Sequence, residues 1–270
     1  MAVVNRTPDS FFDRGRTYAL GAALDHALEQ VADGADLVDV GGVKAGPGPQ
    51  VSLDEELRRV LPFVTAFRAQ SRVPLSVDTW RAEVARAALD EGADMVNDAT
   101  GMVEPEIADV VAADPRATLV VTHAGGPPRT RPFRPVYLPD VTTVVVERCR
   151  DLAAVAERRG VPRDRLVVDP GHDLGKNTAH SLELTRRLGE LAALGYPVLV
   201  ALSNKDFLGE VLAVGVDDRL EASLAAAAVA VCNGARIVRV HATRQTVRAV
   251  RTVEAIMGWR PPAASLRGLE

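Results

Sequence analysis

Short apolar runs recur along the 270-residue chain, and nearly all of them stop at a polar residue or at glycine. The run at 166–168 (Leu-Val-Val) is rich in β-branched residues, ends at Asp169 and is followed by Pro-Gly. Runs of this length that close on turn residues are typical of buried strands rather than helices. We predict eight such strands, at residues 2–4, 37–40, 75–77, 95–96, 119–121, 166–168, 198–202 and 237–240.

Stretches with helical periodicity separate these strands. Leu20, Leu24, Leu28 and Val31 recur at the spacing of one helix face, and Gly34 has the position of a residue that ends the helix. Helical stretches also follow the other predicted strands, and the last of them, from about residue 243, has Val247, Val250 and Ile256 on its inward face. The pattern therefore predicts strand and helix in regular alternation.

Eight strand–helix units in a chain of this length predict a (β/α)8 TIM barrel, which typically needs about 250 residues. The composition does not change along the chain and no linker interrupts it. We therefore expect a single domain over residues 1–270. Two helix starts are also predicted, a capping box formed by Ser52 and Glu55 and a cap at Thr243.

Composition excludes several classes of protein. The net charge of -4 argues against a general nucleic-acid partner, so that any basic site must be local. Cys149 and Cys232 are far apart and belong to no CxxC motif, which favours a reducing cytoplasm over a disulfide framework. The start lacks a signal-peptide pattern, and no apolar run approaches the roughly 20 residues needed to cross a membrane. We expect a cytoplasmic protein without a membrane partner.

The polar residues at the strand ends would meet at one mouth of a barrel, where such folds place their chemistry. Asp78, Asn97 and Asp169 offer two carboxylates and an amide, a set that suits a flat heterocycle rich in N–H and carbonyl groups. Asn5, Arg239 and His241 suit a phosphate or pyrophosphate, because arginine pairs bidentately with phosphate oxygens. Lys205 could serve either group.

Structural roles compete with these functional ones. Asp78 could cap the following helix, a role that Thr79 could also fill, and Asp98 fits a structural role better than a catalytic one. His123 could be a packing histidine. The basic loop that follows it is more typical of a solvated surface than of a site. Its arginines are Arg129, Arg131 and Arg134.

Nearly the whole chain resembles dihydropteroate synthases. The similarity lies in VVNRTPDSFFDRG (3–15), DGADLVDVGG (33–42), SVDTWRAEVARAALDEGADMVND (76–98), VVDPG and GK (167–176), VLVALSNKDFLG (198–209) and RVH (239–241). The resemblance implies a barrel that is usually a dimer. It also implies binding of 6-hydroxymethyl-7,8-dihydropterin pyrophosphate and 4-aminobenzoate, with Mg²⁺ as the metal.

Carried over position by position, the resemblance implies three sets of site residues. Asp78, Asn97, Asp169 and Lys205 would contact the pterin. Asn5, Arg239 and His241 would bind the pyrophosphate, with Asn5 also a metal ligand. The catalytic residues would be Lys205, Arg239 and His241.

The chain departs from the family pattern around the second substrate. Where the family usually has GGESTRPG, this chain has GGVKAGPG, so Lys44, Ala45 and Gly46 replace Ser-Thr-Arg in a loop that helps to hold aminobenzoate and pyrophosphate. The remaining departures are Arg6, Phe12 and Arg14 in the first motif, His172, Asp173 and Leu174 after DPG, and Asn204 and Asp206 around the lysine.

These departures resemble the diverged second copy of the enzyme found in some GC-rich bacteria. Two functions follow as alternatives: a synthase that condenses the dihydropterin pyrophosphate with 4-aminobenzoate, or a pterin-diphosphate-binding paralogue with little synthase activity or another amine substrate. A third alternative is a methyltransfer barrel that binds methyltetrahydrofolate. Arg239 and His241 argue against it, since a methylfolate carries no pyrophosphate.

Overall fold

Strands and helices alternate in a computed structural model of the chain, which describes residues 1–8, 15–127, 129–130 and 136–267. The strands are β1 (Ala2–Asn5), β2 (Val38–Gly41), β3 (Leu75–Asp78), β4 (Met95–Asp98), β5 (Thr118–Thr122), β6 (Leu166–Asp169), β7 (Val198–Val200) and β8 (Ala235–Val238). All eight lie where the sequence predicts them. The bounds differ most at β4, which ends two residues late, at β7, which ends two residues early, and at β8, which begins and ends two residues early.

The strands form one parallel sheet whose spatial order follows the sequence, from β1 to β8. The sheet curls, so that the residues after β8 reach β1: Ala2 and Val240 form an isolated parallel bridge. Across it, the Val3 N–H donates to the Val240 carbonyl at 3.1 Å, and the Val240 N–H donates to the Met1 carbonyl at 2.9 Å. The predicted eight parallel strands in sequence order are confirmed. The predicted barrel is not closed by a ladder between β1 and β8, which are joined by this isolated bridge.

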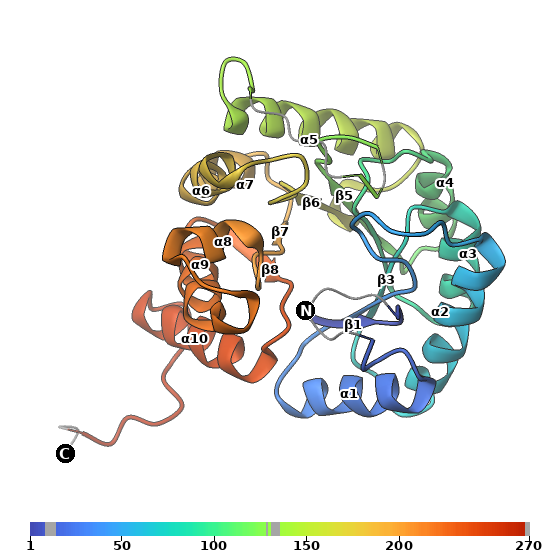
Figure 1. Cartoon of the computed structure of the whole chain (residues 1–270), viewed down its shortest axis with the longest axis horizontal. Helices are drawn as coiled ribbons and strands as arrows, with labels where there is room; N and C mark the ends of the chain where they lie inside the picture. The colour runs from blue at the N-terminus through green and yellow to red at the C-terminus, as the bar shows by residue number, and fades with distance from the viewer. Residues whose placement is uncertain (9–14, 128, 131–135, 268–270) are drawn as a thin grey trace.

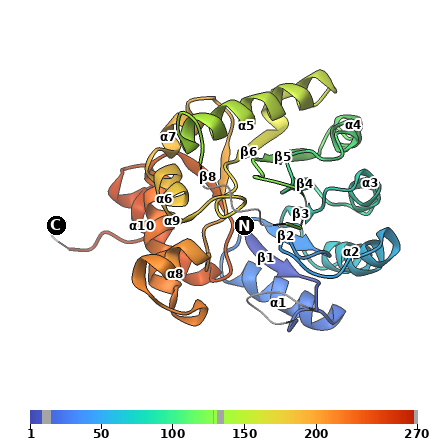
Figure 2. The ribbon, with the colours of Figure 1, turned by 45° about the horizontal axis from the view of Figure 1, so that its top comes forward.

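Helices surround the strands on the outside of the curled sheet (Figure 1; Figure 2). They are α1 (Leu20–Ala32), α2 (Leu53–Arg68), α3 (Ala82–Asp90), α4 (Glu106–Ala113), α5 (Val141–Arg158), α6 (Thr178–Arg186), α7 (Leu188–Ala192), α8 (Asp206–Leu212), α9 (Leu220–Cys232) and α10 (Thr243–Ile256), with 3-10 turns η1 (Arg163–Arg165) and η2 (Val216–Asp218). Among the described residues, no helix is both long and apolar enough to span a bilayer.

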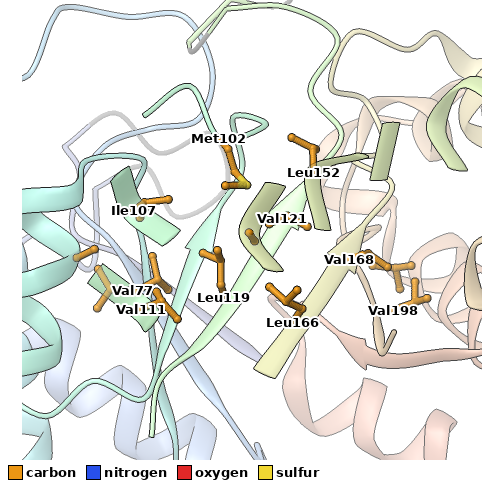
Figure 3. Packing of buried hydrophobic residues seen from close by; sticks show 14 of the residues in the cluster. Val77, Met102, Ile107, Val111, Leu119, Val121, Leu152, Leu166, Val168 and Val198 are labelled. Atoms are coloured by element: carbon orange, nitrogen blue, oxygen red, sulfur yellow. The ribbon is translucent and has the colours of Figure 1, made fainter. Parts of the chain in front are cut away.

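Alternation along each strand divides the core into two regions, because successive strand side chains point to opposite faces. Leu119, Val121, Leu166 and Val168 face outward and pack with helix residues such as Ile107 (Figure 3). The intervening residues form a separate inner cluster enclosed by the curled sheet. That cluster contains Val120, Val167 and Leu199, with Met95 and Ile237 packed against it.

Two local predictions, both of helix caps, need correction. Ser52 does cap α2, since its Oγ accepts the Glu55 N–H at 3.2 Å, but the Glu55 carboxylate binds Arg58 and Arg59 instead of completing a capping box. The N-cap of α10 is Ala242, with no side-chain cap. The apolar face predicted for α1 does pack on the core through Leu24, Leu28 and Val31, beside the buried Ala23 and Ala27, whereas Leu20 is exposed.

Candidate active site

A cavity of about 180 Å³ lies at the carboxyl ends of the strands. Five of the seven polar residues predicted for the site line it, on β3, β4 and β6 and just after β7 and β8. They are Asp78, Asn97, Asp169, Lys205 and Arg239. Parallel strands bring their carboxyl ends together, which is why residues up to 161 positions apart share this space.

Arg239 is the centre of a buried ion-pair network. Its Nε donates to Asp39 Oδ2 at 2.6 Å and its Nη2 donates to Asp78 Oδ2 at 3.1 Å. Asn97 Nδ2 donates to the same Asp39 oxygen at 3.4 Å. The sequence analysis missed Asp39, which is fully buried in β2. A charged residue inside an otherwise apolar strand was the signal that could have identified it, since carboxylates are almost never fully buried unless they are paired.

Burial is the largest influence on the pKa values of Asp78 and Asp169, the two carboxylates predicted to contact a pterin. It raises the pKa of Asp78 to about 7, against the attraction of Arg239. Burial also raises the pKa of Asp169, while Lys205 and the Gly171 N–H, which donates to Asp169 Oδ1 at 2.7 Å, oppose the rise. Asp78 makes no helix-cap contact. Thr79 does not cap the helix either, since its Oγ1 accepts the N–H of Arg81 at 3.2 Å, before α3 begins; the Ala82 N–H at the start of α3 donates to Glu104 Oε2 at 3.1 Å.

Hydrogen bonds of Lys176 connect the two loops that follow β5 and β6. Its Nζ lies 2.8 Å from His123 Nδ1 and donates to the carbonyls of Gly171 at 2.8 Å and Leu174 at 3.0 Å. Burial lowers the pKa of this ammonium to about 7. His123 therefore has a packing and hydrogen-bonding role beside the site, and it does not line the cavity. Lys205 Nζ similarly donates to the His172 carbonyl.

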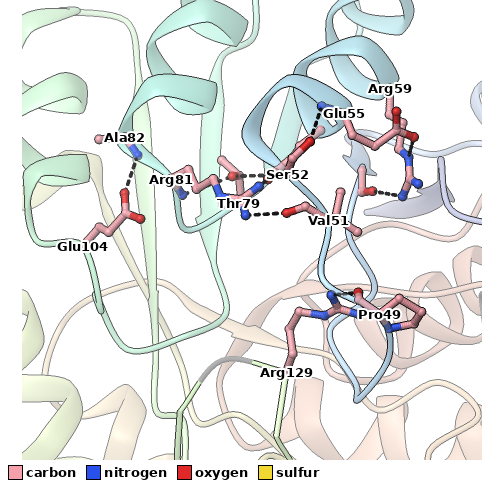
Figure 4. Close-up of polar contacts among 12 residues, drawn as sticks. Pro49, Val51, Ser52, Glu55, Arg59, Thr79, Arg81, Ala82, Glu104 and Arg129 are labelled. Atoms are coloured by element: carbon pink, nitrogen blue, oxygen red, sulfur yellow. Dashed lines mark hydrogen bonds and ion pairs between the residues drawn. The ribbon is translucent and has the colours of Figure 1, made fainter.

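A second, smaller hollow of about 30 Å³ adjoins the cavity and shares Asp78 and Ala45 with it. Arg129 and Trp80 are also in its wall. Arg129 Nη1 donates to the Pro49 carbonyl and so joins the loop after β5 to the loop after β2 (Figure 4). Arg129 is thus a loop contact at the mouth rather than a solvated surface residue. Arg131 and Arg134 lie outside the described residues.

The loop after β2 offers few polar side chains where the family pattern differs. Ala45 lines both hollows with a methyl group, Gly46 is buried, and Lys44 is half-buried and lines neither.

Asp98 has the structural role expected of it, since its Oδ1 and Oδ2 accept the N–H groups of Thr100 and Met102, both at 2.7 Å.

Asn5 and His241 lie at strand ends but do not line the cavity. The Asn5 carbonyl accepts the Thr17 hydroxyl at 2.8 Å, and His241 Nδ1 lies 3.1 Å from Ser203 Oγ. Arg6 follows Asn5 and is 7% exposed, with Nε and Nη1 buried and without hydrogen-bond partners. The pyrophosphate role of Asn5, Arg239 and His241 stays a prediction.

Comparisons with known proteins agree with the sequence motifs. The family described as pterin binding enzyme matches residues 1–241. A Mycobacterium leprae protein named inactive dihydropteroate synthase 2 is 52% identical over 100% of this chain and 94% of its own length. The Escherichia coli dihydropteroate synthase is 39% identical over 95% of this chain and 91% of its own length.

Solved structures give the same result. A Yersinia pestis dihydropteroate synthase, crystallised as a sulfonamide drug complex, superimposes with a TM-score of 0.91 and 36% identity, covering 96% of this chain and 94% of that one. The resemblance inferred from the motifs is therefore confirmed. The chain belongs to the dihydropteroate synthase family of pterin binding enzymes.

Proposed function

We propose that this chain binds 6-hydroxymethyl-7,8-dihydropterin pyrophosphate in the cavity at the strand ends and uses 4-aminobenzoate poorly as the second substrate. The observation that carries this proposal is a difference between the two parts of the site: the cavity is lined by polar side chains, and the loop after β2 is not. The acid–amide–lysine–arginine set that suits a pterin lines one cavity, whereas the loop after β2 contributes only the apolar side chains of Ala45 and, in the adjoining hollow, Val43. The similarity to a relative named inactive agrees with this division.

The pterin ring would be oriented by the cavity's polar side chains. The carboxylates of Asp78 and Asp169 accept hydrogen bonds from ring N–H groups, and Asn97 and Lys205 donate to ring acceptors. Arg239 uses two N–H groups on Asp39 and Asp78, which leaves three of its five donors for a ligand. Because these groups are held in place before the ligand arrives, they orient the reacting methylene at little further cost.

The reaction of the family is displacement of pyrophosphate from the pterin methylene by an aromatic amine. The amine nitrogen forms a bond to the methylene carbon, the C–O bond breaks toward pyrophosphate, and the nitrogen loses a proton. The leaving group is highly charged, so nearby cations stabilise the transition state. We assign this part to Arg239, Lys205 and His241, with Asn5 at the same end of the sheet.

Mg²⁺ fits the site only as an ion that arrives with the diphosphate. It commonly keeps several waters and takes one or two protein oxygens plus substrate phosphates, and the amide oxygen of Asn5 is a suitable donor. The described residues contain no group of three or more acidic, histidine or cysteine ligands. When bound, Mg²⁺ would neutralise phosphate charge.

We also infer that the curled sheet is a closed barrel and that residues 1–270 form one domain. We further infer that the protein is a cytoplasmic homodimer. The bridge between Ala2 and Val240 supports closure. A single sheet gathers strands from both ends of the chain, which supports one domain. Cys149 and Cys232 are free, in keeping with a reducing compartment.

Steady-state turnover tests the proposed function directly. Purified protein with Mg²⁺ and the dihydropterin pyrophosphate should release pyrophosphate slowly with 4-aminobenzoate, at least about a hundredfold below an ordinary synthase assayed in parallel, because a missing site cation costs several kcal/mol. Sulfonamides should inhibit weakly. Calorimetry should still detect pterin binding, and Asp169→Asn should weaken it. Ordinary turnover with ordinary sulfonamide sensitivity would refute the proposal.

A further inference from the structure

Two carboxylates beyond the pterin set line the same cavity. Asp173 belongs to the loop after β6, and Asp206 is the first residue of α8. The Asp206 N–H donates to Asp173 Oδ2 at 3.0 Å, so the two residues form one continuous piece of the wall. The Asp206 side chain is 65% exposed, whereas Asp169 is 6% exposed. This pair therefore lies toward the outside of the cavity, and the pterin acids lie inside it.

Their charges are compensated unequally. Arg219 Nη1 donates to Asp206 Oδ1 at 2.9 Å, which offsets much of the Asp206 charge. Asp173 accepts only from neutral donors, the Asp206 N–H and the Ser181 hydroxyl at 3.4 Å, and pairs with no described cation. Lys205 directs its ammonium to the His172 carbonyl. Asp173 therefore has no ion-pair partner among the described residues, and the cation that attracts it is the buried Lys176, which does not line the cavity.

The lining as a whole is acidic. It contains four carboxylates, those of Asp78, Asp169, Asp173 and Asp206, against two cationic side chains, Lys205 and Arg239. A partly enclosed wall of one charge sign repels ions of that sign and concentrates the opposite ones. 4-Aminobenzoate would have to bring a further carboxylate past the outer pair, because its amine must face the pterin and its para substituent points away.

We propose that Asp173, assisted by Asp206, makes this cavity select a second ligand that carries no anionic group: a neutral or cationic aromatic amine. The inference rests on the proposed function, since it takes the pterin as the first ligand. It adds a reason for poor use of aminobenzoate that is separate from the altered loop after β2. Specificity of this kind comes from repelling one candidate as well as from attracting another.

Three probes that share one ring test the proposal: 4-aminobenzoate, 4-aminobenzamide and 4-aminobenzamidine, with charges of -1, 0 and +1. Their affinities are measured by calorimetry on free and pterin-loaded protein. We expect the amidine to bind most tightly and the carboxylate most weakly, with steps of about fivefold, the size typical of exposed charge interactions. The order should weaken at 1 M salt, where exposed charges are screened.

Charge-only variants assign the effect to these residues. Asp173→Asn is expected to raise the affinity of 4-aminobenzoate about fivefold and lower that of 4-aminobenzamidine, with a smaller change in Asp206→Asn because Arg219 already offsets that charge. Asparagine tolerates the φ of 63° at residue 173, so the loop should keep its shape. Asp90→Asn, an exposed acid at the opposite end of α3, is the matched control and should change nothing.

The possible results separate the two proposals. Equal affinities of the three probes for wild type, or an unchanged order in Asp173→Asn, would overturn this inference. Failure of every probe to bind pterin-loaded protein would overturn it as well. Absence of pterin binding would refute the proposed function instead, and the charge order measured on free protein would still decide this inference.

Discussion

Asp78 and Asp39 both accept hydrogen bonds from Arg239, and at Asp78 the effect of burial on the pKa outweighs the attraction of this cation. Burial raises the pKa of Asp78 to about 7 although the Arg239 guanidinium is in contact with it. Burial likewise lowers the pKa of Lys176 to about 7 in the neighbouring loops. Single residues in this site are therefore tuned by desolvation more than by their partners.

Pterin affinity should rise with pH up to about 7 and then level off. Below its pKa, Asp78 is protonated and offers one acceptor fewer to the ring N–H groups, so affinity should increase up to tenfold per pH unit until the carboxyl ionises. The ligand should be 6-hydroxymethyl-7,8-dihydropterin without diphosphate, because phosphate groups titrate in the same range. Asp78→Asn cannot titrate, and it should lose the step near pH 7. A wild-type profile without that step would contradict the assignment.

We expect Arg6 to lower the stability of the folded protein and to strengthen the binding of anions. Its buried Nε and Nη1 have no hydrogen-bond partners, and such unsatisfied groups cost about 1–3 kcal/mol each. Arg6→Met should therefore raise the free energy of unfolding by at least about 1 kcal/mol, measured in urea, and should weaken inorganic pyrophosphate binding at the Asn5 end of the site. Arg16→Met removes an exposed arginine from the same loop and is the control. A less stable Arg6→Met protein would show that Arg6 has an internal partner.

At the scale of elements, the loops after β5 and β6 act as one unit. Gly125 and Gly175 are in van der Waals contact, Tyr137 Oη donates to the Gly175 carbonyl at 2.8 Å, and Lys176 bonds both loops. Because Asp169 is the last residue of β6, directly before this loop, the loop packing helps to determine where its carboxylate lies. The strand positions the residue, and the paired loops fix its orientation.

Gly175→Ala should separate these loops. A Cβ at residue 175 would lie 2.4 Å from the Gly125 Cα, and the φ of 65° favours glycine. We expect a loss of about 1–3 kcal/mol in unfolding free energy, the usual cost of overpacking, together with weaker pterin binding by calorimetry. Gly215→Ala has open space around it and should stay within about 0.5 kcal/mol of wild type. Unchanged pterin affinity in Gly175→Ala would show that the packing of these loops does not orient the pterin-binding residues.

At the scale of the whole molecule, the curled sheet places chemistry at one end and leaves apolar side chains on the outer helices. Val229 on α9 is 48% exposed and Ile256 on α10 is 78% exposed, and Met257 follows at 47%. Exposed apolar groups gathered on adjacent helices are typical of interaction surfaces. This face is our candidate for the homodimer contact.

Sedimentation velocity should give a particle of twice the 28.8 kDa chain mass at micromolar concentration. Ile256→Glu and Val229→Glu should shift it toward the monomer, because an unpaired charge would be buried in the contact. Val103→Glu, at an exposed apolar position before α4, is the control and should remain dimeric. A wild-type protein that sediments as a monomer would contradict the homodimer, and dimers in all three variants would place the contact elsewhere.

The sequence alone determined the order of elements and the polar residues at the strand ends. A strand buried on both faces reads as an apolar run, and it stops where the chain reaches water, so runs such as 166–168 and the acid that follows them mark both the strand and its functional end. The motifs also determined the family. Within the candidate site, Asp78, Asn97, Asp169, Lys205 and Arg239 could be named in advance for this reason.

Tertiary structure decided how those residues contact one another. The contacts of Arg239 with Asp39, of Lys176 with His123 and of the Asp206 N–H with Asp173 join residues that are distant in sequence, and their geometry depends on loop packing rather than on any periodic pattern. The pKa shifts of Asp78 and Lys176 could not be read from the sequence, because their largest cause is burial in the folded protein. Local signals misplaced the cap of α10, whose N-cap residue is Ala242 rather than Thr243.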